Sequence, residues 1–205
     1  MTAETKSDGT PNLRQSAKAK TRSAIIKAAG QLFAKQGVDE TRAEDIARRA
    51  KVGVGTIYLH FGDKDGLLRE ILLEAADDLY GRVEQVYLDA SISPAGTAGA
   101  HAETLVQYVE QHGRMAGFVL GLLSGGQPTA RTMLDRAVEQ MAEHIRQCQQ
   151  KGLCRRDLDP HLAARALVQM NLGLLAWWAE DPRRAAREDI LATLAKLRSS
   201  GLGGE

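Results

Sequence analysis

The sequence is poor in aromatic residues, in proline and in cysteine. Of its 205 residues, 4% are aromatic, five are proline and two are cysteine. Sandwiches of short strands are enriched in aromatic residues and turn every ~8–12 residues, so this composition disfavours them. Two cysteines are also too few for a disulfide framework. We therefore expect long helices and an all-α fold.

Long apolar runs are absent as well. No segment approaches the ~18 consecutive apolar residues that a membrane span requires. Residues 1–12 are polar and contain nothing like the hydrophobic core of a secretory signal. With hydrophobic residues at 43% and charged residues at 26%, the composition is that of a globular protein. The expectation is a cytoplasmic protein that has no membrane partner.

Acidic residues are missing from one stretch near the N-terminus. None occurs between Asp8 and Asp39, although six lysines and arginines do. Residues 1–66 carry 12 basic and 8 acidic side chains, a net charge of +4, whereas residues 67–205 carry 15 and 18 and have a net charge of −3. A local excess of cations attracts a polyanion, so the pattern favours nucleic-acid binding by the N-terminal third. The alternative is an ordinary solvated helix face.

Residues 13–61 have the pattern of three helices. The first covers residues 13–36, and Gly37 ends it. Thr41 and Glu44 are spaced as a capping box, which predicts a second helix that runs to about Ala50. A third follows over residues 54–61. Two eight-residue helices separated by three or four residues have the dimensions of a helix-turn-helix. Its expected core consists of Ile25, Leu32, Phe33, Ile46, Ala47, Ala50, Val52, Ile57 and Phe61.

The rest of the chain is expected to form a second helical domain. Asp63 caps a helix over residues 64–88, which at 1.5 Å per residue spans ~37 Å and can link two domains. A loop is expected over residues 91–99. Asp159 and Asp181 each precede a proline, the signal of an N-cap and a first helical residue. Further helices are expected over residues 100–112, 114–123 and 128–151, after Asp159 and after Asp181. The predicted division is a flexible tail over residues 1–12, a DNA-binding domain over 13–62 and an effector-binding and dimerisation domain over 63–200.

The segment from His161 to Trp178 is apolar on nearly all sides, so it must be covered on nearly all sides. Its own domain can cover one surface. A second copy of the chain is the simplest cover for the other, because a two-fold contact buries both copies at once. The expected interface of this homodimer consists of Leu167, Leu174, Trp178, Ile190, Leu194 and Leu197.

A run of about 50 residues carries a family signature. It comprises residues 21–29, Leu32, Phe33, Ala34, Gly37, Thr41, Asp45, Ile46, Ala47, Ala50, Val52, Gly55, Thr56, Ile57, Tyr58, His60, Phe61, Asp63, Lys64, Leu67 and Leu68. This ordered set closely resembles the N-terminal signature of TetR-type transcriptional regulators. The resemblance implies a homodimer whose two helix-turn-helix units enter successive major grooves of a palindromic double-stranded DNA operator. It also implies a small-molecule effector in the C-terminal domain that changes the separation of those units.

The resemblance also suggests which residues contact DNA. By family position, Thr41, Tyr58, His60 and Lys64 are similar to residues that contact phosphates. The expected recognition helix contains no Arg, Lys, Asn or Gln, the side chains that read guanine or adenine bidentately. We therefore expect base contacts from Val54, Gly55 and Thr56, a contribution from operator shape, and guanine reading by Arg42. Lys51 stands where the family's turn commonly has Gly, which gives it a strained left-handed conformation and a possible phosphate contact.

Effector-lining residues are expected between the long helix and those that follow it. The candidates are Tyr108, Met115, Phe118, Leu122, Met133, Met141, Met170, Asn171 and Trp177. Ligand sites are mostly apolar with a few polar anchors, and no cluster of acids or bases marks a charged effector. A neutral or weakly polar apolar effector is favoured. For each candidate, plain core packing is the alternative.

Catalysis, cofactors and resident metals are not expected. The sequence has no nucleophile–base pair, cofactor loop or metal-ligand cluster, which argues against an enzyme with an incidental helix-turn-helix. His144 and Cys148 share a helix face, and Cys154 is near in sequence, so metal or redox sensing stays open. The leading hypothesis is a repressor released by a ligand. A DNA-binding regulator without small-molecule input, or an activator, remains the alternative.

Overall fold

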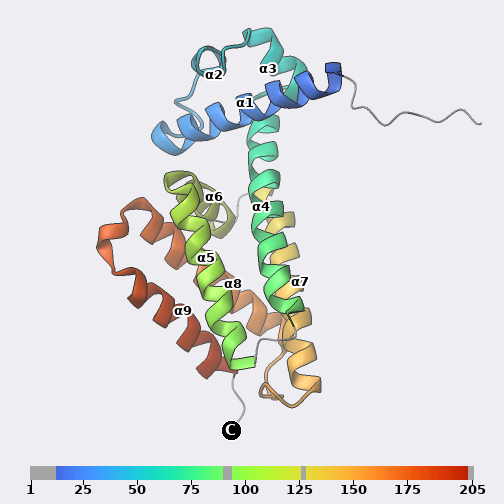
Figure 1. Cartoon of the computed structure of the whole chain (residues 1–205), viewed down its shortest axis with the longest axis vertical. Helices are drawn as coiled ribbons and strands as arrows, with labels where there is room; N and C mark the ends of the chain where they lie inside the picture. Colours follow the sequence, from blue (N-terminus) through green and yellow to red (C-terminus); the bar gives the residue numbers. More distant parts are fainter. Residues whose placement is uncertain (1–12, 90–93, 126–127, 203–205) are drawn as a thin grey trace, which may run out of the picture.

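The computed structural model describes residues 13–89, 94–125 and 128–202, and within these ranges it is helical with no β-strand (Figure 1). The expected all-α fold is confirmed. The helices are α1 (Leu13–Gln36), α2 (Ala43–Ala50), α3 (Val54–Phe61), α4 (Lys64–Leu88), α5 (Pro94–His112), α6 (Arg114–Ser124), α7 (Pro128–Gln150), α8 (Pro160–Glu180), the 3₁₀ turn η1 (Pro182–Arg184) and α9 (Arg187–Leu202).

Helices α1 to α3 pack together at one end of the molecule, and their buried residues are continuous with the core of the other helices (Figure 1). Ile25, Phe33, Ile46 and Ile57 are at most 3% exposed. The remaining members of the predicted core are buried or packed against it. The bounds of all three helices agree with the sequence pattern, because each apolar stripe has one partner surface to cover it.

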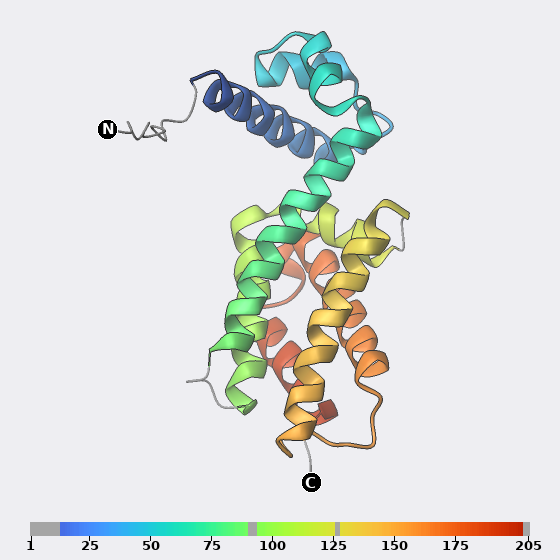
Figure 2. The same cartoon turned by 90° about the vertical axis from the view of Figure 1, so that its right-hand side faces the viewer.

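Helix α4 runs from this end of the molecule along the remaining helices (Figures 1 and 2). As predicted, Asp63 caps it, and its carboxylate accepts a hydrogen bond from the Gly66 amide at 2.7 Å. A Cβ at Gly66 would lie 2.1 Å from the carbonyl oxygen of Phe61, so the tight turn from α3 requires glycine there. Arg22 of α1 forms ion pairs with Glu70 and Glu74 of α4, which fix α1 against the upper part of α4.

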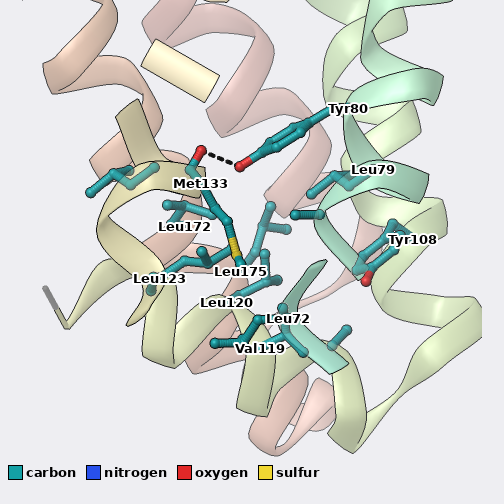
Figure 3. Packing of buried hydrophobic residues seen from close by; sticks show 14 of the residues in the cluster. Leu72, Leu79, Tyr80, Tyr108, Val119, Leu120, Leu123, Met133, Leu172 and Leu175 are labelled. Carbon is teal, nitrogen blue, oxygen red and sulfur yellow. Dashed lines mark hydrogen bonds between the residues drawn. The ribbon is translucent and has the colours of Figure 1, made fainter. Parts of the chain in front are cut away.

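Helices α5 to α9 form a bundle in which α6 packs on α8, α9 packs on α5, and α7 packs on both α4 and α8 (Figure 2). Its interior is apolar (Figure 3). One polar link crosses it, because the Tyr80 hydroxyl of α4 donates a hydrogen bond to the Met133 carbonyl of α7. Among the described residues, no helix combines the length and the apolar character that a bilayer span needs.

Three local predictions were wrong. The Thr41–Glu44 capping box does not form: α2 begins after Arg42 and has no side-chain cap, because the Thr41 hydroxyl donates to the Gly37 carbonyl at 2.6 Å instead. Residues 94–99, expected in a loop, belong to α5, since proline is well tolerated at the first helical position. Residues 90–93 lie outside the described part. Asp181 caps only the single turn η1, and α9 begins later, at Arg187.

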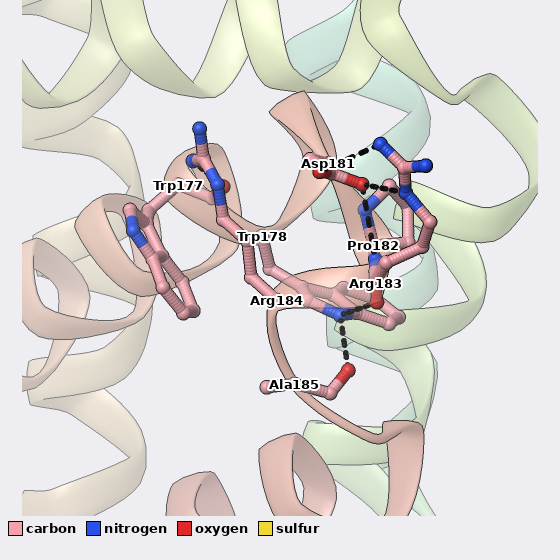
Figure 4. A network of polar contacts seen from close by, with 7 residues as sticks. All are labelled: Trp177, Trp178, Asp181, Pro182, Arg183, Arg184 and Ala185. Atoms are coloured by element: carbon pink, nitrogen blue, oxygen red, sulfur yellow. Dashed lines mark hydrogen bonds and ion pairs between the residues drawn. The ribbon is translucent and has the colours of Figure 1, made fainter.

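Trp178 holds the turn between α8 and α9 (Figure 4). Its ring is 3% exposed, and its Nε1 donates hydrogen bonds to the carbonyls of Pro182 at 3.2 Å and Ala185 at 3.1 Å. The neighbouring Trp177 is 44% exposed and has the Arg184 guanidinium over its ring at 5.5 Å. The two adjacent tryptophans therefore lie on different faces of α8, one buried and one exposed.

Replacing Trp178 by phenylalanine should lower the free energy of unfolding by ~1–3 kcal/mol, because the partly buried hydrogen bonds to the Pro182 and Ala185 carbonyls lose their donor. Urea unfolding followed by circular dichroism measures the change. Tyr58→Phe is the matched control: Tyr58 is 52% exposed, so its effect should stay within ~0.5 kcal/mol. Equal effects of the two substitutions would show that the Trp178 hydrogen bonds contribute nothing to stability.

Candidate DNA-binding surface and effector cavity

The connection between α2 and α3 is a tight turn with a left-handed residue. Lys51 has φ 58° and ψ 44°, and its amide donates to carbonyls of the last turn of α2. Gly53 then adopts an extended conformation and precedes the first residue of α3. The predicted left-handed Lys51 is confirmed. This turn sets α3 across α2 in the arrangement of a helix-turn-helix.

One face of α3 points away from the protein. Ile57 and Phe61 are buried, whereas Gly55 is exposed, Tyr58 is 52% exposed and Leu59 is 85% exposed. A Cβ at Gly55 would meet no atom within 4 Å. The exposed face of α3 is therefore free to approach a large partner closely.

A cleft of about 330 Å³ lies beside α3, between the start of α2 and the start of α4. Arg42, Tyr58 and Lys64 line it and bring two cations and a phenol together. The Lys64 ammonium donates to the Asp39 carbonyl at 3.3 Å. The carboxylates of Asp39, Glu44 and Asp63 line the same cleft. The first turns of α2 and α4 also open here, and helix N-termini favour anions through their free amides. The groups in the cleft that suit phosphate oxygens are therefore Arg42, Lys64, the Tyr58 hydroxyl and these amides, against the three carboxylates.

The second candidate site is a cavity of about 50 Å³ between α4, α5, α6, α7 and α8. Its lining is mostly aliphatic. The residues are Leu79, Tyr80, Val83, Tyr87, His101, Leu105, Leu123, Leu134, Ala137, Gln140, Met141, Val168, Asn171, Leu172 and Leu175. A cavity of this size holds only a few water molecules in its present form.

Two buried polar side chains of the cavity stand out. Asn171 is 7% exposed and His101 is 5% exposed, and within the described part of the chain neither side chain makes a hydrogen bond. By contrast, Gln140 donates to the Tyr80 carbonyl at 3.3 Å. Buried polar groups are normally hydrogen-bonded, so Asn171 and His101 are available to a ligand.

Tyr87 stands at the centre of an aromatic stack at this cavity. The His144 ring lies 4.2 Å from its ring, and the His101 ring lies 5.8 Å away and nearly parallel. The Arg198 guanidinium lies 5.3 Å from the centre of the same ring. Burial, reinforced by Arg198, lowers the pKa of His144 to about 4 and holds that of His101 well below its usual value. Both imidazoles are therefore neutral near pH 7.

Known proteins resemble both the sequence and the fold. A family model described as "Bacterial regulatory proteins, tetR family" matches residues 25–71. The HTH-type transcriptional repressor DhaR of Mycobacterium sp. (strain GP1) is 28% identical over 156 residues, which are 74% of this chain and 79% of DhaR. The structure of NalD, the secondary repressor of the MexAB-OprM multidrug efflux pump in Pseudomonas aeruginosa, matches with a TM-score of 0.68 and 26% identity, and covers 93% of this chain and 99% of NalD. Residues 25–71 therefore match the TetR family of bacterial regulatory proteins, and the chain is similar in sequence and fold to transcriptional repressors.

The similarity to known regulators also bears on two of the hypotheses. The HTH-type transcriptional regulator UidR of Escherichia coli (strain K12) is 25% identical over 173 residues, which are 81% of this chain and 86% of UidR. These relatives are transcriptional regulators and not enzymes. The alternative of an enzyme with an incidental helix-turn-helix is therefore set aside.

Most of the predicted DNA-contact residues lie on the surface of α2 and α3 or beside it. Arg42, Lys51, Gly55 and Tyr58 are exposed, and Val54, Thr56, His60 and Lys64 are partly exposed. Thr41 is the exception, at 2% exposure. A phosphate can only accept hydrogen bonds, and the single hydroxyl proton of Thr41 is already donated to Gly37. We therefore remove Thr41 from the phosphate contacts.

The cavity contains only two of the nine predicted effector-lining residues, Met141 and Asn171. Tyr108 and Met115 line a separate groove between α1, α4 and α5. Phe118 lies beside Phe33, with 6.3 Å between ring centres. The other four, Leu122, Met133, Met170 and Trp177, do not line the cavity either. The sequence prediction missed Tyr80, Tyr87, His101 and Gln140, although Tyr80 and Tyr87 share a stripe of α4 with Val83.

The predicted dimer residues fall into two groups, those buried within the protomer and those that remain accessible. Trp178, Ile190 and Leu194 are each 3% exposed, so the protomer itself already covers them. As direct interface contacts they were wrong, because α9 turns its most apolar stripe toward α5. Leu167 and Leu174 are half-buried and Leu197 is 50% exposed, which leaves these three available to a partner.

The cysteines and histidine singled out in the sequence lie together, and the Cys148 sulfur is 3.5 Å from the His144 Nε2. In the part of the chain that the structure describes, no three His, Cys, Asp or Glu side chains are arranged to hold a metal ion. Burial raises the pKa of the Cys154 thiol to about 11, which disfavours the thiolate that metal ligation needs. The contact between Cys148 and His144 therefore does not indicate a metal site.

Lys51 offers a test of the turn and of its DNA contact together. Lys51→Gly should raise the free energy of unfolding by ~0.5–1 kcal/mol, because glycine adopts the left-handed conformation without strain. If Lys51 contacts a phosphate, the same variant should bind operator more weakly, with a slope of log affinity against log salt smaller by about one. Fluorescence anisotropy at several salt concentrations measures this slope. An unchanged slope would contradict the phosphate contact.

Proposed function

We propose that this protein is a dimeric repressor that binds a palindromic operator and is released by a small, largely apolar ligand. Helix α4 is the observation that carries the proposal. Its first residue, Lys64, lines the cleft beside α3, and its residues Leu79, Tyr80, Val83 and Tyr87 line the cavity. One continuous helix therefore connects the two candidate sites. The two domains would be residues 13–62 and 63–200.

The DNA contacts follow from the exposed surface of α2 and α3. We assign phosphate contacts to Lys51, Tyr58, His60 and Lys64, each of which has a donor for a phosphate oxygen. Val54, Gly55 and Thr56, at the start of α3, would approach the bases. Arg42, exposed at the start of α2, would read guanine.

The outward face of α8 supports the dimer. Leu162 is 71% exposed and Trp177 is 44% exposed, and Ala166 and Gly173 are exposed between them. Leu197 of α9 is an exposed leucine of the neighbouring surface. A two-fold contact through the α8 face would bury it in both protomers at once.

The size of the cavity explains how a ligand would release DNA. Drug-sized ligands occupy pockets of roughly 300–1,000 Å³. The cavity holds about 50 Å³, so a ligand must push its walls apart, and α4 is one of these walls. Two recognition helices have to lie about 34–36 Å apart to enter successive grooves, so a shift of α4 by a few ångströms misaligns them.

Operator selection from random double-stranded DNA tests the proposal. We expect a palindrome with two half-sites about one helical turn apart, bound by a dimer in sedimentation experiments. A protein that stays monomeric, or that ignores duplex DNA even at low ionic strength, would contradict it. Ligands found by thermal shift should also weaken operator binding, because coupling is reciprocal. If stabilising ligands never do so, the regulator without small-molecule input is the better description, and increased transcription from the bound promoter would indicate an activator.

A further inference from the structure

Arg198 of α9 is a buried cation with no acidic partner among the residues that the structure describes. The residue is 5% exposed, and within the described residues no carboxylate lies within 4.0 Å of its guanidinium. Its one hydrogen bond runs from Nη1 to the Tyr87 hydroxyl at 3.5 Å, a weak contact. By comparison, Arg187 of the same helix pairs with Glu103 and Glu110. Burying an unpaired charge is costly, so the absence of a counter-charge needs an explanation.

The groups around Arg198 do not supply a counter-charge. Those that interact with its charge are Tyr87, His101, His144 and Cys154. Burial raises the pKa of Tyr87 and of the Cys154 thiol, so both keep their protons near pH 7. Both histidines stay neutral. The cluster therefore holds a single positive charge and several hydrogen-bond donors, which is the composition of an anion site.

Arg198 does not line the effector cavity itself but lies behind two residues that do. Tyr87 and His101 line the cavity, and both interact with Arg198. Asn171, buried and without a hydrogen bond, adds an amide donor to the same lining. The other lining residues are predominantly aliphatic, among them Val83, Leu105 and Leu175. The cavity thus combines an apolar body with one electropositive end.

We propose that the effector is a small monocarboxylic acid whose apolar part occupies the cavity and whose carboxylate lies at the Tyr87–His101 end, attracted by Arg198. This inference rests on the proposed effector function and specifies its ligand class. The carboxylate would supply a counter-charge that the described residues do not provide. A neutral ligand would leave the guanidinium of Arg198 without a counter-charge from the ligand.

Matched ligands test the charge requirement. Thermal shift is measured on the full chain with butyrate, hexanoate, octanoate, benzoate and phenylacetate, and with the corresponding primary amides. We expect at least one acid to raise the melting temperature in a saturable way, and its amide to need at least about tenfold more ligand for the same shift, a difference of ~1.4 kcal/mol. Acids that give no shift, or amides that match them, would overturn the proposal.

Substitutions at position 198 test the residue. Arg198→Met should remove the preference for acid over amide, and Arg198→Lys should keep it. Without ligand, Arg198→Met should melt at or above the wild-type temperature, because it removes an unpaired buried charge. Arg183→Gln, whose side chain is 89% exposed, is the matched control and should change neither value. Should Arg198→Met fail to fold, Tyr87→Phe, which loses only the hydroxyl at the carboxylate end, should still weaken acid binding. An acid preference that survives in Arg198→Met would overturn the assignment, and so, where Arg198→Met does not fold, would acid binding that Tyr87→Phe leaves unchanged.

Operator binding by fluorescence anisotropy separates this inference from the proposed function. If a neutral ligand stabilises the protein and releases operator while no acid binds, the inference fails and the proposed function stands. If an acid binds through Arg198 and leaves operator affinity unchanged, the ligand class is correct and the release mechanism is wrong.

Discussion

Replacing Gly55 by glutamate should abolish operator binding while the protein stays folded. Gly55 lies in the first turn of α3, it is exposed, and no atom lies within 4 Å of the position of a Cβ. The new side chain therefore meets no obstacle in the protein, and any residue other than glycine or proline favours a helix by ~0.5–1 kcal/mol. Against DNA, the same side chain would block the closest approach of α3 and bring a negative charge to the phosphates.

We expect the affinity for operator to fall by at least about 100-fold, or ~2.7 kcal/mol of binding free energy. Fluorescence anisotropy measures the affinity, and thermal unfolding checks the fold. Gly81→Glu makes the same chemical change on the exposed side of α4, where a Cβ also meets nothing within 4 Å. This control should bind almost normally. Gly55→Ala separates the effect of bulk from that of charge. Equal affinities of Gly55→Glu and Gly81→Glu would show that α3 does not face DNA.

Helix bounds were predictable from the sequence where local signals agree. Asp63, followed by an apolar stripe, predicted the start of α4, and Gly37 and Gly62 predicted the ends of α1 and α3. The capping box failed because a serine or threonine hydroxyl has several carbonyls and amides within reach. At Thr41 the turn that follows α1 presents the Gly37 carbonyl, and the hydroxyl donates to it. The spacing to Glu44 does not reveal this competition.

The DNA-binding surface was easier to predict than the cavity. Residues 41–64 are contiguous, and their positions depend on two short helices and one turn. The cavity depends on the packing of α4, α5, α6, α7 and α8, and all of these except α4 come after the signature. Periodicity indicates which stripe of a helix is buried, yet it does not distinguish a residue that meets a void from one that meets a neighbour. Met141 lines the cavity, for example, whereas Met133, two turns earlier on α7, does not.

Periodicity also failed to distinguish two adjacent residues of a helix. One step along a helix rotates the side chain by about 100°, so an error of one residue changes the face. Trp177 was predicted to line the effector site and Trp178 to face a partner. The structure buries Trp178 against η1 and exposes Trp177. In a segment that is apolar on every side, the sequence pattern does not indicate which face of the helix is buried in the protomer.

Gly173→Glu is the second substitution with a large expected effect, because it places a charge in the middle of the exposed apolar face of α8. Gly173 is exposed, has Trp177 one turn later on the same face, and a Cβ there would meet no atom within 4 Å. The isolated protomer should therefore tolerate the substitution. In a two-fold dimer built on this face, each protomer would carry a buried carboxylate without a counter-charge, near its own copy across the axis.

We expect the dissociation constant of the dimer to rise by at least about 100-fold, which sedimentation velocity at several protein concentrations measures. Operator affinity should fall with it, because a lone protomer contacts only one half-site and loses the contribution of the second. Gly81→Glu again serves as the control and should remain dimeric. A second pair compares exposed leucines: Leu162→Glu on α8 should act like Gly173→Glu, whereas Leu153→Glu, 43% exposed after α7, should not. A Gly173→Glu protein that stays dimeric at nanomolar concentration would place the two-fold interface on another surface, and the spacing of the recognition helices would then have to be set by helices other than α8.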